Sequence, residues 1–159
     1  GRRRTDMSNW FKRVLLGGGP ASAPVTLRRF TAADSALNGY AVPDAGGWMV
    51  EAGEPVVVRL FEVRDPETEQ CLLTYRAALK SEGLEGRAFL EMWCRLPGRG
   101  EFFSKGLNQP LKGTTGWSSY EIIFRLKKGQ QPDLIKLNLA IEGRGKVWIK
   151  DVELLKTPR

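Results

Sequence analysis

Residues 71–96 read CLLTYRAALKSEGLEGRAFLEMWCRL, and apolar and polar side chains alternate along both halves of this stretch. Successive side chains of a β-strand point to opposite faces, so the alternation predicts two strands, each with one buried face. The residues expected on the buried faces are Cys71, Leu73, Tyr75, Ala77 and Leu79 in the first half and Ala88, Leu90, Met92, Cys94 and Leu96 in the second. Residues 81–86 are expected to form the turn of an antiparallel hairpin between them.

Further strand signals lie on both sides of this stretch. We expect strands at residues 25–30, 48–52, 55–63, 117–127, 134–141 and 145–155, the last of them after a tight turn at Gly143, Arg144 and Gly145. Turn-forming Pro and Gly residues separate these segments, and no helical periodicity appears among them. Eight or nine short antiparallel strands predict an all-β sandwich or barrel.

The N-terminal segment differs from the rest of the chain in charge and pattern. The chain has 25 Lys and Arg against 18 Asp and Glu, but seven of the basic residues and only one acidic residue, Asp6, lie within residues 1–30. Residues 8–16 predict a short amphipathic helix, and the Gly- and Pro-rich residues 17–24 predict a linker. We therefore divide the chain into a basic tail with its linker, residues 1–24, and a β-sandwich binding domain, residues 25–159. Because the domain is nearly neutral, nucleic acid is not an expected partner.

Three roles are open for the tail. Its arginines at positions 2–4 and its apolar stripe of Trp10, Phe11, Val14 and Leu15 suit contact with an anionic membrane surface through residues 2–16. The same stripe could instead dock on the sandwich of its own or a neighbouring chain. The tail could also be the juxtamembrane part of an anchor, although no run in the chain approaches the roughly 18 apolar residues of a membrane-spanning helix.

Residue counts exclude several catalytic classes. Histidine is absent, which excludes Ser-His-Asp and Cys-His catalysis and the His-containing zinc motifs. Cys71 and Cys94 are the only cysteines; both fall on expected core faces, diagonal to each other in the predicted hairpin, so we expect buried free thiols. Glu91 and Glu121 could be imagined as a glycosidase pair, but nothing in their spacing makes them face each other. The sequence favours a non-catalytic protein.

The C-terminal third has a recognisable order of short motifs. GWSSYE at residues 116–121 opens one strand, KGQ follows at residues 128–130, and GRGKVWIKDVEL at residues 143–154 forms the last strand. This order resembles the closing strands of galactose-binding-like jelly rolls, which include several families of bacterial carbohydrate-binding modules. The resemblance covers roughly the last 45 residues. It implies a jelly-roll β-sandwich that acts as a carbohydrate-binding module.

The resemblance has implications for metal binding and location. Many such modules hold a structural calcium ion near the chain ends, which implies Asp151 as a metal ligand in this sequence. The ammonium group of Lys150 beside it would repel Ca²⁺, which takes six to eight oxygen ligands. No other cofactor is expected. A carbohydrate-binding role favours an extracytoplasmic or membrane-anchored location.

One aromatic and five polar side chains form the expected ligand-binding face. They lie opposite the apolar alternation on neighbouring strands, and they are Arg76, Glu91, Trp93, Arg95, Lys136 and Asn138. Sugars bind to such faces because their C–H groups stack on an indole while their hydroxyls bond to Arg, Glu and Asn. The alternative is that Trp93 is covered as a minor second core and the charged residues form cross-strand pairs.

Other aromatic residues offer weaker candidates. A loop containing Asn108 and Gln109, next to Phe102 and Phe103, could bind a ligand at one end of the sandwich. We expect instead that Phe102 and Phe103 lie on a strand, one in the core and one exposed, and that Trp117 and Trp148 pack in the core. If the domain has no small-molecule site, it is a structural or protein-interaction domain of a membrane-associated or secreted protein.

Overall fold

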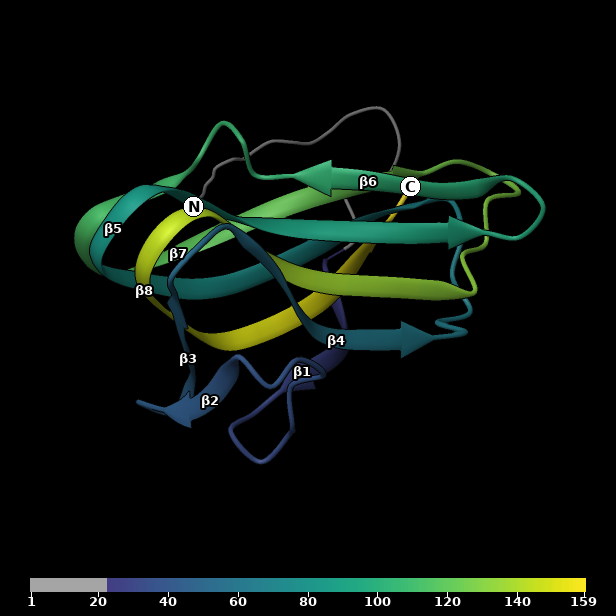
Figure 1. The fold of residues 1–159 in the computed structure, drawn as a ribbon. Coiled ribbons are helices and arrows are strands. Elements are labelled where there is room, and N and C mark those ends of the chain that lie inside the picture. Colours follow the sequence, from purple (N-terminus) through teal and green to yellow (C-terminus); the bar gives the residue numbers. More distant parts are fainter. Residues whose placement is uncertain (1–22) are drawn as a thin grey trace, which may run out of the picture.

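The computed structural model describes residues 23–159 as an all-β domain, with no helix in that range (Figure 1). The eight strands are β1 (Val25–Phe30), β2 (Ala41–Asp44), β3 (Gly47–Ala52), β4 (Val56–Arg64), β5 (Cys71–Leu96), β6 (Gly100–Lys105), β7 (Leu111–Leu126) and β8 (Leu134–Pro158). All strand pairs are antiparallel. The predicted all-β class is confirmed. The predicted helix at residues 8–16 and the membrane contact through residues 2–16 fall outside the described residues.

Two long strands, β5 and β8, join the sheet into a sandwich. They pair with each other along their whole length and curve around one end of the molecule, at the left in Figure 1. In the first layer, residues 145–158 of β8 lie between β1 and β3 on one side and residues 71–82 of β5 on the other, with β7 beyond β5. In the second layer the order is β4, residues 134–142 of β8, residues 87–96 of β5, and β6.

The expected hairpin turn at residues 81–86 is wrong, because β5 continues through these residues into the other layer. The expected turn at residues 143–145 is likewise a bend within β8. Glycine permits both bends, since Gly86 pairs with Gly143 where the two backbones approach most closely. A Cβ atom on Gly86 would collide with the carbonyl oxygen of Glu142, and one on Gly143 would collide with that of Glu85.

The alternating apolar residues predicted for the core are buried between the layers. All ten residues expected on the inner faces of β5 are buried, and residues of β8 and β4 complete the core, among them Ile135, Leu137, Leu139, Val147, Ile149, Val58 and Leu60. Tyr75 projects from the first layer across the core. Its hydroxyl donates a 3.1 Å hydrogen bond to the backbone carbonyl of Asn138 in the second layer. This bond braces β8 directly below the site described next.

Both cysteines are buried and free, which confirms the prediction of buried free thiols. Cys71 begins β5 and Cys94 lies near its end, so the bend brings both to the same end of the sandwich. Burial, with a contribution from Cys71, raises the pKa of the Cys94 thiol to about 12. Thr68 Oγ1 lies 3.3 Å from the sulfur of Cys71. Both thiols are therefore expected to be unreactive in the folded protein.

Two strand segments were not predicted. β2 forms a hairpin with β3, and β7 begins at Leu111, before the strand expected at residues 117–127. Both segments lie at an edge of the sheet, and neither shows an apolar alternation long enough to mark a buried strand. In the described part of the chain, no helix is long and apolar enough to cross a membrane.

Candidate functional site

The outer face of the second layer gathers five of the six residues predicted to bind a ligand. Glu91, Trp93 and Arg95 follow one another at every second position of β5 and point away from the core. Lys136 and Asn138 do the same on the neighbouring strand β8. The strand register places Trp93 opposite Lys136 and Glu91 opposite Asn138.

Arg76 lies apart from this group. It precedes the bend of β5, and its guanidinium group lies on the outer face of the first layer, 3.1 Å from Glu153 and 3.9 Å from Glu121. The expectation that Arg76 shares a face with Trp93 is corrected, because the alternation of β5 continues across the bend into a different layer. The same bend separates Glu91 from Glu121, so these two carboxylates do not face each other.

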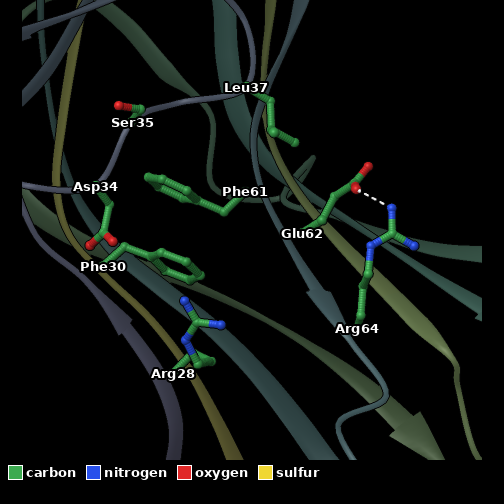
Figure 2. A pocket seen from close by; sticks show the side chains of 8 residues that line it. All are labelled: Arg28, Phe30, Asp34, Ser35, Leu37, Phe61, Glu62 and Arg64. Atoms are coloured by element: carbon green, nitrogen blue, oxygen red, sulfur yellow. Dashed lines mark hydrogen bonds and ion pairs between the residues drawn. The ribbon is translucent and has the colours of Figure 1, made fainter.

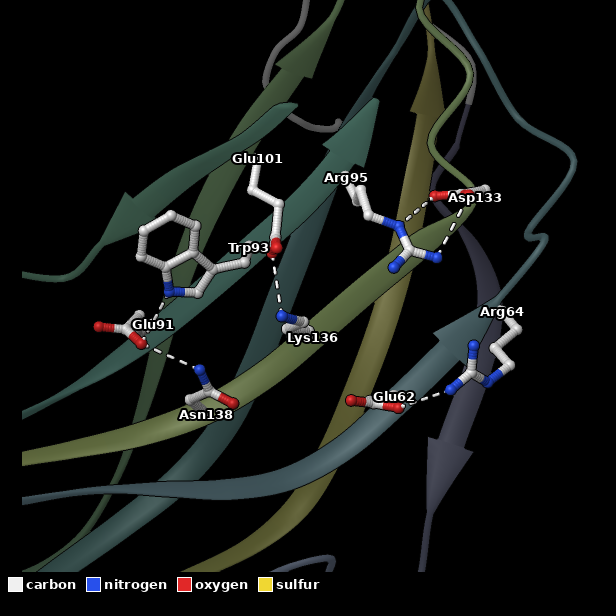
Figure 3. A network of polar contacts seen from close by, with 9 residues as sticks. All are labelled: Glu62, Arg64, Glu91, Trp93, Arg95, Glu101, Asp133, Lys136 and Asn138. Atoms are coloured by element: carbon white, nitrogen blue, oxygen red, sulfur yellow. Dashed lines mark hydrogen bonds and ion pairs between the residues drawn. The ribbon is translucent and has the colours of Figure 1, made fainter. Parts of the chain in front are cut away.

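Glu91 is the centre of a buried polar network at the floor of this face (Figure 3). Its side chain is almost inaccessible, at 4% exposure. Its Oε2 accepts 2.9 Å hydrogen bonds from Trp93 Nε1 and from Asn138 Nδ2. The ammonium group of Lys105 on β6 lies 3.7 Å from its Oε1. Glu91 therefore positions Trp93 and Asn138 and has little surface left for a ligand of its own.

Asn138 has an unpaired oxygen. The side chain is 4% exposed, and its amide nitrogen faces Glu91, because a carboxylate accepts hydrogen bonds and donates none. Its Oδ1 consequently points to the other side, as Figure 3 shows, and has no hydrogen-bond partner within residues 23–159. A buried unsatisfied acceptor costs about 1–3 kcal/mol. Such a group is unusual in a folded protein unless something else bonds to it.

A groove of about 390 Å³ has Asn138 among its lining residues. Its lining residues come from all four strands of the second layer: Val57, Arg59, Glu91, Trp93, Glu101, Lys136 and Asn138. The groove adjoins a second hollow of about 270 Å³, which shares Val57 and Glu91 and continues along the strands past Phe89. Together they form an elongated depression across the outer face of the second layer.

Ion pairs surround the groove. Lys136 Nζ lies 3.0 Å from Glu101, and Arg95 forms two hydrogen bonds of 2.8 and 3.2 Å to Asp133 (Figure 3). The hydrogen bond from Arg95 holds the pKa of Asp133 below its usual range. Of the predicted binding residues, Arg95 and Lys136 are thus already engaged with carboxylates. Both remain at the rim, where their charges contribute to the electrostatic field of the groove.

β6 adds an aromatic edge to this face. Phe103 lies opposite Trp93 with the ring centroids 5.1 Å apart, and the ammonium group of Lys105 is 4.5 Å from the Phe103 centroid. Phe103 and Phe102 are 54% and 44% exposed, so the strand is confirmed but the prediction that one of them is buried is wrong. β6 is an edge strand that pairs only with β5. Asn108 and Gln109 line a different, more polar depression beside Lys105.

Four residues of the site were not predicted from the sequence. Val57 and Arg59 come from β4, Lys105 from β6, and Glu101 from the beginning of β6. β4 was predicted, but its run of apolar residues does not show which side chains face outward. Its pairing with β8 shifts between Arg59 and Phe61, and this irregularity cannot be seen in the sequence.

A cavity larger than the groove lies elsewhere and suits a ligand less well. It has a volume of about 600 Å³ and opens between β1, the loop that follows it and β4 (Figure 2). Its aromatic rings, Phe30 and Phe61, are buried and stack on each other with centroids 4.0 Å apart, while Arg28 lies over Phe30 and Arg64 pairs with Glu62. No aromatic face is free there to stack on a ligand.

Trp117 and Trp148, which we expected in the core, lie half-buried on the outer face of the first layer. Lys80 Nζ lies between them, 5.4 and 4.6 Å from their ring centroids, and Lys150 Nζ is 4.2 Å from that of Trp117. The expectation of core packing is wrong because the inward positions beside Trp148 are taken by Val147 and Ile149. Lysine side chains cover these rings by cation–π contact.

Nothing around Asp151 indicates a metal site. The residue is exposed and adopts a left-handed conformation with φ 54°, at the irregularity where β8 changes register against β5. No group of three or more His, Cys, Asp or Glu side chains within residues 23–159 is placed to hold a metal ion. Asp151 is accounted for as the extra residue of a β-bulge.

Comparison with known proteins gives the fold a name. No family model and no curated protein matches the sequence. Among solved structures, the chain is similar to a CBM4 carbohydrate-binding module, with a TM-score of 0.53, 8% identity, and coverage of 76% of this chain and 77% of that one. It is also similar to the CBM22-1 xylan-binding domain of Paenibacillus barcinonensis Xyn10C, with a TM-score of 0.51, 10% identity, and coverage of 88% and 99%.

The same fold also occurs outside carbohydrate-binding modules. A Stig cyclase from Fischerella is similar at a TM-score of 0.51 and 12% identity, with coverage of 81% of this chain and 73% of that one. At such low identities the similarity concerns the fold and not the function. The jelly-roll architecture implied by the C-terminal motifs is confirmed: the chain has the β-sandwich fold of carbohydrate-binding modules.

Proposed function

We propose that this protein is a non-catalytic carbohydrate-binding module and that the groove of the second layer binds the glycan. The observation that carries the proposal is the groove itself, in which the half-buried indole of Trp93 lies beside the polar side chains of Arg59 and Lys136. Sugars bind to such a combination because their C–H groups pack on an aromatic ring while their hydroxyls bond to polar side chains.

The side chains of the groove supply the contacts that sugars use. Trp93 is half-buried and fixed by its hydrogen bond to Glu91, so its indole offers an ordered surface for the C–H groups of a sugar ring. Phe103 extends this aromatic surface at the edge of the sheet. Arg59 and Lys136 provide donors for sugar oxygens. The elongated shape of the depression suits a chain of sugar residues better than a single compact ligand.

The carboxylates of the groove support binding without catalysis. Glycoside hydrolysis requires an acid and a base or nucleophile that both reach the scissile bond. Glu91 is occupied by Trp93, Asn138 and Lys105, and Glu101 is paired with Lys136. Neither group is free to transfer a proton or to attack a sugar.

The test is affinity electrophoresis against a panel of soluble polysaccharides, followed by calorimetry with those that retard the protein. We expect Trp93→Ala to weaken binding at least about tenfold, which corresponds to roughly 1.4 kcal/mol. Trp117→Ala is the matched control, since it removes an indole from the outer face of the opposite layer and should leave binding unchanged. If Trp93→Ala folds poorly, Phe103→Ala removes an exposed part of the same surface. Absence of binding to every polysaccharide, or an equal effect of both tryptophan variants, would refute the proposal.

A further inference from the structure

In the described part of the chain, one basic side chain of the groove has no carboxylate partner. Arg59 on β4 lies opposite Asn138 in the strand register and lines the groove beside it. Within residues 23–159, no Asp or Glu oxygen forms an ion pair with its guanidinium group.

The other basic residues of this face are neutralised. Lys136 pairs with Glu101 and Lys105 with Glu91, while Arg95 pairs with Asp133 and Arg64 with Glu62. Figure 3 shows three of these four pairs along the face, all but the one between Lys105 and Glu91. Each of these four basic groups is therefore paired with a carboxylate. The guanidinium group of Arg59 has no such partner within residues 23–159. A bound ligand that supplied one negative charge would complete the set.

The carboxylate of Glu91 does not cancel this charge. It is buried, and two hydrogen-bond donors and one ammonium group already surround it. Arg59, in contrast, is exposed at the groove wall. A guanidinium group presents a planar pair of N–H donors, a geometry that matches the two oxygens of a carboxylate.

We propose that the groove selects acidic glycans, with the carboxylate of a uronic acid residue on Arg59 and the ring of the same or the next sugar on Trp93. This inference rests on the proposed carbohydrate-binding function and specifies its ligand class. A uronate supplies an anionic acceptor to Arg59, which lies opposite Asn138 on the neighbouring strand. Trp93 lies across the groove from them, where the sugar ring can stack.

The experiment compares each acidic polymer with its own neutral form. Polygalacturonate, alginate and glucuronoxylan are titrated by calorimetry beside their carboxyl-reduced derivatives, in which each carboxylate has become a hydroxymethyl group. Wild type is expected to bind at least one acidic polymer about tenfold or more tightly than its reduced form, because a charged bidentate contact is lost on reduction. The Arg59→Gln variant should bind the two forms equally.

Arg125→Gln is the matched control for charge. Arg125 is an exposed residue of β7 in the first layer, so this variant loses the same charge far from the groove and should keep the full preference for the acidic polymer. Urea unfolding of both variants checks that they are folded.

Three results would overturn the inference. The selection of acidic glycans would be refuted if wild type bound the reduced polymers as tightly as the acidic ones, or bound neutral polysaccharides only. The carbohydrate-binding function would then still stand. Equal losses in Arg59→Gln and Arg125→Gln would show attraction by net charge without a site. No binding of any polysaccharide, acidic or neutral, would refute the proposed function and the inference together.

Discussion

Replacing Gly86 with alanine tests whether the close approach of β5 and β8 at their bends maintains the sandwich. Gly86 has φ +92°, and an added Cβ would lie well inside 3.0 Å of the carbonyl oxygen of Glu142. The positive φ costs a residue with a side chain about 1–2 kcal/mol. Moving the two backbones apart costs about 1–3 kcal/mol more. We therefore expect the free energy of unfolding to fall by about 2–5 kcal/mol.

Urea unfolding followed by tryptophan fluorescence measures this loss. With a urea dependence of about 2 kcal/mol per molar, the midpoint should fall by about 1–2.5 M. Gly129→Ala is the control for conformation, because Gly129 has φ +83° but open space around it, so it should lose only about 1–2 kcal/mol. Gly53 has neither a positive φ nor a close neighbour, so Gly53→Ala should leave the free energy of unfolding unchanged or raise it slightly. If Gly86→Ala loses no more stability than Gly129→Ala, the close backbone approach at the bend does not contribute and the reasoning is refuted.

Three further predictions concern titratable groups. Partial burial would raise the pKa of Glu153, but hydrogen bonds from its two arginine partners lower it below the ordinary 4.5. The ionised Glu153 therefore stabilises the fold above pH 4.5, and this stabilisation is lost as the pH falls through the lowered pKa. In urea titrations, Glu153→Gln should be less stable than wild type at neutral pH and should lose less stability on acidification. Intact-mass alkylation should label neither Cys71 nor Cys94 in the native protein and both in denaturant without reductant; a labelled native thiol would contradict the burial described above. Glu91→Gln should lower the free energy of unfolding by about 1–2 kcal/mol, since two charge-assisted hydrogen bonds become neutral ones; unchanged stability would show that the network is not needed.

Alternation along β5 predicted which side chains face the core, and this part of the sequence interpretation was correct. It could not predict the layer to which each half belongs. A two-residue period separates inside from outside, but a sandwich has two outer faces, and both carry the same polar pattern. Arg76 and Trp93 were grouped for this reason, although the bend of β5 places them on opposite sides of the molecule.

The remaining parts of the site depend on strand neighbours that are distant in sequence. Arg59 reaches Asn138 only through the pairing of β4 with β8, and Lys105 reaches Glu91 only through the pairing of β6 with β5. No local pattern indicates either pair. Trp148 is a different case, because its position between the inward-facing Val147 and Ile149 already indicated an outward side chain. We expected Trp148 in the core because large aromatic side chains are mostly buried. The alternation of the strand was the better guide.

The bends of β5 and β8 also decide where this fold tolerates changes in chain length. At the bent end both strands pass from one layer to the other without a loop. One inserted residue there would shift half of a strand against its neighbours and turn the core side chains of that half outward. The connections at residues 65–70 and 127–133 meet at the opposite end, where Glu69 accepts hydrogen bonds from Gly129 and Gln131. Insertions and deletions can be absorbed there without disturbing a strand. Added length at this end therefore leaves the paired strands that carry the groove in register.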